Sequence, residues 1–173
     1  MSQREHSRAE LQRKLLPHAR AELAGIGDAV GVASGDEGTN GHPAETGDPG
    51  EAAAARVERL LDELAAAGWL SDARAAESLV STKAPRFGAA RLRRMLVERG
   101  VAREAADAAL EQARATEFQR AFEVWRRRFG EPATDAPGRA RQQRFLLSRG
   151  FPAAIVRRIT GGDTVFEDDP GDL

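Results

Sequence analysis

The chain has 173 residues, 41% hydrophobic and 31% charged, which suits one compact domain or a short array of small modules. Its 26 basic residues nearly balance 27 acidic ones, and the absence of cysteine excludes a disulfide scaffold, a cysteine zinc site and a thiol nucleophile. No apolar run approaches the length of about 18 residues needed for a membrane span. The first residues also lack the apolar stretch of a signal peptide, so we expect a cytoplasmic protein with no membrane partner.

Apolar residues at helical spacing dominate the sequence, and strand signals are nearly absent. Ser7 is predicted to cap a first helix, with Glu10 completing a capping box. The next helices are predicted over residues 52–67 and from Ser71 to just before Pro85. The remaining predicted helices are 88–99, a pair over 102–127 that breaks near Ala115, one opening at Pro137 or Gly138, and one opening at Pro152.

Two acidic segments interrupt this pattern. Residues 24–55 carry six acidic side chains and no base, and residues 161–173 carry five and no base. The segment 25–50 is rich in glycine and polar residues and has no periodic apolar positions, so we predict a disordered loop there and a frayed acidic tail after residue 161. The segment from Arg86 to Arg158 is instead basic, with 17 basic and 8 acidic residues.

An internal repeat is the most specific feature of the sequence. Residues 88–100 and 138–150 are identical at seven of 13 positions when offset by 50. The identical pairs are Gly88/Gly138, Ala90/Ala140, Arg91/Arg141, Arg94/Arg144, Leu96/Leu146, Arg99/Arg149 and Gly100/Gly150. A weaker third copy begins at Ser7, where Ala9, Leu11, Arg13 and Leu15 match Ala90, Leu92, Arg94 and Leu96.

The repeat predicts an all-α protein of tandem three-helix, helix-turn-helix-like modules, stacked in an elongated array that is straight or curved. The expected divisions are a first repeat over 1–67, which contains the acidic insertion 25–50, a second over 68–113, a third over 114–160, and the tail 161–173. Each module is too small to stand alone, so neighbouring modules are expected to stack along an axis.

Four stretches, in this order, are similar to the bacterial RecX family of recombination regulators. They are Arg4-Glu5-His6-Ser7, Gly68-Trp69-Leu70-Ser71-Asp72, Arg86-Phe87-Gly88 with Arg91-Leu92, and Arg144-Phe145-Leu146-Leu147-Ser148-Arg149-Gly150-Phe151. The family usually has a helix before the first of these stretches, so we expect either that the first repeat is incomplete and lacks a helix or that the start of the chain is set downstream of the true one. The insertion at 25–50 is also long for the family.

The resemblance implies a non-enzymatic protein that binds RecA and the RecA–DNA filament. It further implies inhibition of strand exchange, ATP hydrolysis and coprotease function, in DNA repair and the SOS response. No cofactor is implied, and the chain is expected to be a monomer that binds single- or double-stranded DNA weakly at most. Consistent with this, the sequence shows no histidine and carboxylate set with metal-ligand spacing and no Walker-type phosphate loop.

Arginines of the second and third repeats are the candidate partner-binding or DNA-binding residues, because guanidinium forks bind phosphates and carboxylates. The set is Arg86, Arg91, Arg94, Arg99, Arg126, Arg127, Arg128, Arg141, Arg144, Arg149, Arg157 and Arg158. Any single arginine is readily explained as a solvated helix residue, whereas the pairs repeated at an offset of 50 favour a function. Trp125 is interpreted as core and Trp69 as a packing residue between domains.

Two alternatives stay open. The first is a helix-turn-helix protein that binds duplex or single-stranded DNA directly, without RecA. The second is an α-helical adaptor for another partner, whose binding would be insensitive to the repeated arginines.

Overall fold

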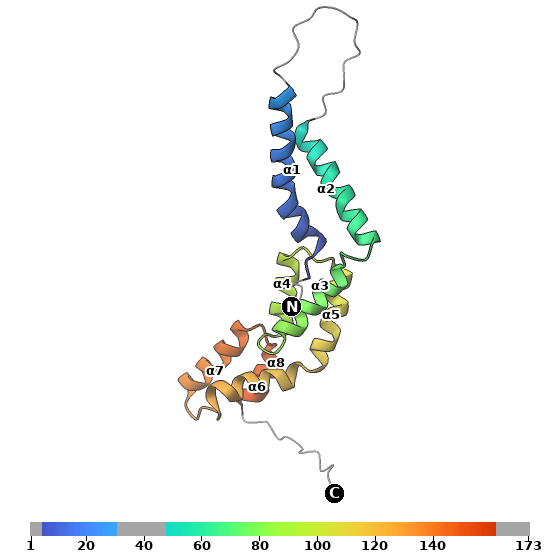
Figure 1. Cartoon of the computed structure of the whole chain (residues 1–173). Helices are drawn as coiled ribbons and strands as arrows, with labels where there is room; N and C mark the ends of the chain where they lie inside the picture. Colours follow the sequence, from blue (N-terminus) through green and yellow to red (C-terminus); the bar gives the residue numbers. More distant parts are fainter. Residues whose placement is uncertain (1–4, 31–47, 162–173) are drawn as a thin grey trace, which may run out of the picture. The chain divides into compact units, whose positions relative to one another are not determined.

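The computed structural model describes residues 5–30 and 48–161, and within these ranges the chain forms eight α-helices and no strand (Figure 1). They are α1 (Arg8–Val30), α2 (Pro49–Ala66), α3 (Asp72–Lys83), α4 (Ala89–Glu98), α5 (Arg103–Ala115), α6 (Glu117–Phe129), α7 (Ala136–Ser148) and α8 (Ala153–Thr160). The all-α prediction is therefore confirmed. The chain divides into two compact units, Met1–Asp72 and Ala73–Leu173.

In the first unit, α1 packs against α2 through a small apolar core. Val57, Leu61 and Leu70 are buried, and Leu11 and Leu15 of α1 pack against them. Val57 and Leu61 are four residues apart on α2, as Leu11 and Leu15 are on α1, so each helix buries one apolar stripe against the other.

The predicted loop over 25–50 is wrong at both ends, because α1 continues to Val30 and α2 begins at Pro49. A helix that has already nucleated gains a hydrogen bond with each further residue, so it can extend into a polar, glycine-containing stretch. At the other end, the Asp48 carboxylate accepts a hydrogen bond from the Gly50 N–H at 3.1 Å and so caps α2. The rest of the predicted loop and the predicted tail beyond Gly161 lie outside the described residues.

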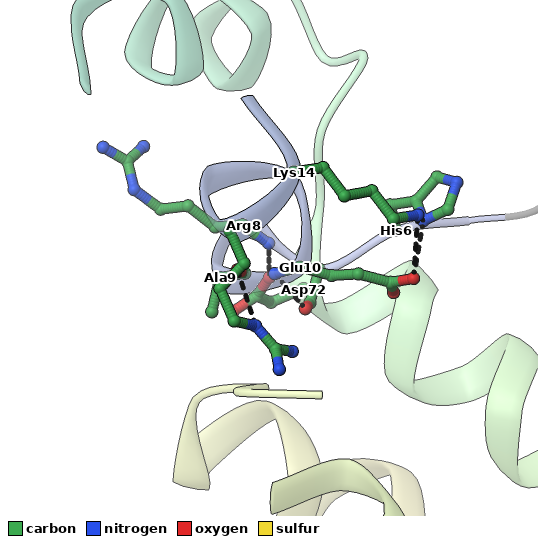
Figure 2. A network of polar contacts seen from close by, with 8 residues as sticks. His6, Arg8, Ala9, Glu10, Lys14 and Asp72 are labelled. Carbon is green, nitrogen blue, oxygen red and sulfur yellow. Dashed lines mark hydrogen bonds and ion pairs between the residues drawn. The ribbon is translucent and has the colours of Figure 1, made fainter. Parts of the chain in front are cut away.

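Side chains from both ends of the first unit cap the start of α1 (Figure 2). Ser7 Oγ accepts a hydrogen bond from the Glu10 N–H at 3.2 Å, which confirms the predicted cap. Asp72 Oδ1 accepts a second one from the Arg8 N–H at 2.8 Å, although the two residues are 64 positions apart. The Arg8 guanidinium in turn bridges Glu58 and Asp62 of α2. Ser7, the last residue of the Arg-Glu-His-Ser stretch, therefore caps the start of α1.

Glu10 of this cap is expected to make the stability of the first unit depend on pH. Burial raises the pKa of Glu10, but hydrogen bonds from Lys14 Nζ at 3.2 Å and from His6 outweigh burial and set the pKa below its ordinary value. A lowered carboxyl pKa stabilises the fold above the unfolded pKa, and this contribution is lost as the pH falls through the folded pKa.

Glu10→Gln should therefore lower the melting temperature by about 2 °C near neutral pH, and this effect should be lost in acid, once the pH has fallen through the folded pKa of Glu10. Thermal unfolding followed by far-UV circular dichroism at both pH values measures this difference. Glu63→Gln is the control, because it removes the same charge from an exposed position on α2 of the same unit. An equal effect of Glu10→Gln at both pH values would contradict the assigned role of the carboxylate.

The second unit contains two successive three-helix modules, α3–α5 and α6–α8, each with its own core. The first core is centred on Leu92, Leu96 and Leu110, which are fully buried. The second is centred on Trp125 and Ile159. The predicted break between the helices of 102–127 is confirmed at Thr116, which ends α5 and begins α6.

The repeated sequence builds the same turn twice. Gly100 and Gly150 follow α4 and α7 with φ of 69° and 84°, a region that glycine enters without steric cost. In the first copy the Val101 N–H reaches back to the Leu96 carbonyl at 3.1 Å, and in the second the Phe151 N–H donates to the Leu146 carbonyl at 3.3 Å. The residue after each glycine is buried, so each turn directs the chain back into its core.

Candidate partner-binding surface

A groove runs between the two modules of the second unit and is the candidate site. It has a volume of about 820 Å³. Its lining comes from the end of α3, the loop before α4, the last turn of α6 and the end of α7. The lining residues are Thr82, Lys83, Pro85, Arg86, Phe87, Val124, Arg127, Arg128, Phe145 and Arg149. We call this feature the inter-repeat groove.

The inter-repeat groove is strongly basic. Five of its lining residues are cations, Lys83, Arg86, Arg127, Arg128 and Arg149, and none is acidic. Burial lowers the pKa of Arg149, and the positive charges of Arg91, Arg86 and Arg128 lower it further. These like charges are therefore close enough to repel one another, and an anionic ligand bound among them would reduce the repulsion.

Backbone carbonyls and aromatic rings, rather than carboxylates, hold the groove arginines in place. Arg91 donates to the Ser148 carbonyl at 3.0 Å, and Arg149 donates to the Arg86 carbonyl at 3.3 Å, so each module hydrogen-bonds the backbone of the other. The Arg91 guanidinium lies 4.5 Å above the Phe87 ring, and that of Arg149 lies 4.5 Å above the Phe145 ring. Among the described residues, no carboxylate forms an ion pair with the arginines that line the groove or with Arg91.

The structure divides the twelve candidate arginines. Arg86, Arg127, Arg128 and Arg149 line the inter-repeat groove, and Arg91 lies beside it. Arg141 shares an adjoining hollow with Arg128, Phe129 and Phe145. The others lie outside the groove lining: Arg94, Arg99, Arg126, Arg144, Arg157 and Arg158. Arg158 covers the Phe118 ring at 4.4 Å.

Equivalent positions in the repeat therefore have different surroundings. Arg149 lines the groove, but its counterpart Arg99 is not among the lining residues. Arg91 contacts the other module, whereas Arg141 borders the adjoining hollow. The repeat predicts which helix each arginine is on, but the packing of one module on the next decides which arginines meet.

Two residues that the sequence did not single out position the groove. Arg120 of α6 donates to the carbonyls of Ala84 at 2.6 Å and Phe87 at 2.7 Å, and also to the carbonyl of Ala113. Buried Glu117 accepts from the Ala89 N–H at 2.6 Å and so caps α4. Burial lowers the pKa of Arg120, and the charge of Glu117 opposes that shift. One sequence feature could have indicated that α4 is capped from another module. Its N-cap residue is Gly88, and glycine has no side chain with which to cap its own helix.

Arg120→Met is expected to destabilise the second unit by about 2 kcal/mol, because it removes a charged donor from three carbonyls at once. Urea unfolding followed by tryptophan fluorescence measures the change, since Trp125 is buried in this unit. Arg126→Met on the same helix is exposed and should cost less than about 0.5 kcal/mol. Equal effects of the two substitutions would show that the carbonyl contacts contribute nothing.

The two tryptophans differ in how far they are exposed to solvent. Trp125 is buried, and its ring N–H donates to Gln142 Oε1 at 3.1 Å, in agreement with its interpretation as core. Trp69 is 74% exposed and takes no part in the core of the first unit, so its interpretation as a packing residue between domains stays a prediction. It follows Gly68, whose φ of 76° turns the chain after α2. Leu70, the next residue, is the one buried in the core of the first unit.

Within the described ranges, no cluster of three or more histidine or acidic side chains could hold a metal ion. Over the same ranges, none of the helices combines the length and apolar character that crossing a membrane requires.

Comparison with known proteins places both modules of the second unit in one family. Residues 71–110 match the domain described as "RecX, second three-helix domain", and residues 115–160 match "RecX, third three-helix domain". "Regulatory protein RecX" of Leptothrix cholodnii is 43% identical over 159 residues, covering 92% of this chain and 81% of its own. The protein of the same name from Ralstonia nicotianae is 40% identical over 169 residues, covering 98% of this chain and 86% of its own. The chain is therefore a member of the RecX family of regulatory proteins.

Proposed function

We propose that this protein binds RecA and the RecA–DNA filament and inhibits strand exchange, ATP hydrolysis and coprotease function, in DNA repair and the SOS response. It acts by binding rather than by catalysis, as a cytoplasmic monomer. The observation that carries the proposal is the inter-repeat groove, where cations without carboxylate partners meet between two modules of RecX type. A nucleoprotein filament presents the acidic groups and phosphates that such a surface binds.

A second observation favours a partner built from repeated subunits. Val97 is 66% exposed and Leu147 is 47% exposed, and the two occupy equivalent positions in the 13-residue repeat. Each lies three residues after an exposed arginine of the same helix, Arg94 or Arg144, so each module presents an arginine and an aliphatic side chain on one face. A filament offers the same protein surface repeatedly, so both pairs can bind at once.

The test is a titration of the protein against ATP hydrolysis by RecA on single-stranded DNA at physiological salt. Inhibition well below one chain per RecA molecule is expected, at concentrations where the protein alone does not bind the DNA. Unchanged hydrolysis together with tight, salt-dependent DNA binding would overturn the proposal and favour the direct DNA-binding alternative, which the basic groove also supports.

The double variant Val97→Ser and Leu147→Ser is expected to weaken inhibition of RecA about tenfold without loss of stability, because both side chains are exposed. The same titration measures it. Leu60→Ser is the control, because Leu60 is 42% exposed on α2 and has no place in the 13-residue repeat. Inhibition as strong as that of the unmodified protein would exclude a protein contact at Val97 and Leu147.

A further inference from the structure

We propose that the acidic tail that follows α8, residues 162–173, binds the inter-repeat groove of its own chain and competes there with other anionic ligands. The contact lies within one chain, so the inference goes beyond the proposed function and does not depend on RecA. Three observations support it: the opposite charges of tail and groove, the unused donors in the groove, and the point at which the tail leaves the fold.

The tail and the groove carry opposite charges in equal number. The groove lining contains five cations and no acidic residue. The tail contains five acidic residues and no basic one, and both tail and groove belong to the second unit, whereas the other acidic segment, residues 24–55, belongs to the first. The acidic residues of the tail are Asp163, Glu167, Asp168, Asp169 and Asp172.

The groove arginines keep hydrogen-bond donors for such a ligand. The side chains of Arg86 and Arg128 make no hydrogen bond or ion pair with another described residue. Burial lowers the pKa of Arg149, and neighbouring arginines lower it further, so these cations repel one another. Carboxylates placed among them would accept the unused donors and reduce that repulsion.

The apolar part of the groove lining favours a peptide over a simple anion. Pro85, Phe87, Val124 and Phe145 line the groove beside its cations. In the tail, two apolar residues directly precede three consecutive acids, in the order Val165-Phe166-Glu167-Asp168-Asp169. A ligand with this pattern suits both kinds of surface, because its apolar side chains leave water while its carboxylates pair with guanidinium groups.

The tail leaves the fold close to the groove. The last helix, α8, ends at Thr160, whose Oγ1 accepts a hydrogen bond from Gln143 Nε2 of α7 at 3.2 Å. Gln143 lies six residues before Arg149 of the groove, a distance of about 9 Å along a helix. The acids at 167–169 follow Thr160 by seven to nine residues, enough extended chain to span about 25 Å. The tail is therefore long enough to reach the groove.

Attachment to the same chain strengthens such a contact. A ligand tethered by a short linker has an effective concentration in the millimolar range, whatever the protein concentration. A contact that would be weak between separate molecules is then occupied most of the time. Another ligand has to displace the tail, so the groove selects strongly acidic surfaces over weakly acidic ones.

The first measurement locates the tail in the full chain. The sequence has no cysteine, so Leu173→Cys takes a single nitroxide spin label in the tail. The nitroxide weakens the amide NMR signals of residues that lie near it. At low ionic strength, we expect Arg86 and Arg128 to lose signal and Glu104, on α5 outside the groove, to keep it. Salt at about 1 M should restore the lost signal, since the screening length then falls to about 3 Å.

Three variants of the full chain separate the tail, the groove and general charge. The tail variant removes three acids, the groove variant removes two groove arginines, and the control variant removes three exposed acids from helices outside the groove. Their substitutions are Glu167→Gln with Asp168→Asn and Asp169→Asn, Arg86→Gln with Arg128→Gln, and Glu63→Gln with Glu77→Gln and Glu104→Gln. Circular dichroism checks that all three are folded.

The tail variant and the groove variant should both abolish the loss of amide signal, whereas the control variant should retain it. Fluorescein-labelled polyglutamate then serves as a free competitor, and its binding is followed by fluorescence anisotropy. The tail variant should bind it about tenfold more tightly than the control variant, because a groove that the tail fills about nine-tenths of the time loses about tenfold in apparent affinity.

Undiminished amide signals in the unmodified protein would overturn the proposal. Equal binding of polyglutamate by the tail and control variants would overturn it too, since general charge would then explain the affinity. A mixture of spin-labelled chains with unlabelled ¹⁵N chains should show no loss of signal, and a loss there would assign the tail to a second copy instead. RecA is absent from every sample, so these outcomes leave the proposed function to its own titration.

Discussion

Replacement of Gly88 by alanine is expected to destabilise the second unit by about 3 kcal/mol, the largest effect on stability that we predict for one methyl group. A Cβ atom at Gly88 would lie 2.2 Å from the Gly150 carbonyl oxygen and 2.6 Å from the Phe151 backbone nitrogen. Both are backbone atoms of the other module, so no side-chain rotation relieves the overlap. The modules would have to separate, and the hydrogen bond from the Gly88 N–H to the Arg149 carbonyl at 2.9 Å would be lost.

Urea unfolding followed by the fluorescence of buried Trp125 measures this destabilisation. Gly130→Ala is the control, because a Cβ there meets nothing within 4 Å and only the φ of 78° is unfavourable. Together with the ψ of −52°, this backbone conformation costs alanine about 2 kcal/mol, which is less than the overlap at Gly88. A Gly88→Ala protein no less stable than the Gly130→Ala protein would refute the close approach of the two modules.

The second large effect concerns function. Arg86→Gln with Arg128→Gln is expected to raise the concentration needed for half-inhibition of RecA ATP hydrolysis about 100-fold. Each substitution removes one charge-assisted contact of roughly 1.4 kcal/mol to an anionic filament, and the two losses add. Stability should be unaffected, because neither side chain hydrogen-bonds another described residue.

The control for that experiment is Arg103→Gln with Arg114→Gln on α5, which changes the net charge by the same amount as the groove variant. Those arginines form ion pairs with Asp107 and Glu111 of their own helix. Full inhibition by the control and loss by the groove variant is the expected pattern. Equal inhibition by both would show that the inter-repeat groove has no part in regulating RecA.

Most of the fold could be predicted because its determinants are local. Gly100 and Gly150 end their helices by adopting a conformation that few other residues reach, and the sequence displays them at a fixed offset. The break at Thr116 was likewise visible in the apolar spacing. The end of α1 at Val30 was missed, because extension of an existing helix depends on small free-energy differences without a sharp sequence signal.

The sequence predicted the candidate site only as a set of arginines, without indicating which of them lie together. Sequence spacing could not distinguish Arg149, which lines the groove, from its repeat counterpart Arg99. That distinction arises where one module packs on the next, which is a non-local event. Arg120 was overlooked for the same reason, since its three acceptor carbonyls come from α5 and from the segment between α3 and α4.

The capping of α4 affects how the chain can be divided. Its first turn is completed from the neighbouring module, by the Glu117 carboxylate on the Ala89 N–H and the Arg149 carbonyl on the Gly88 N–H. A chain cut at the sequence boundary between the repeats, after Ala113, would leave α4 without these acceptors. The second and third repeats therefore form one folding unit, which limited proteolysis should release as a single fragment and which truncation should inactivate as a whole.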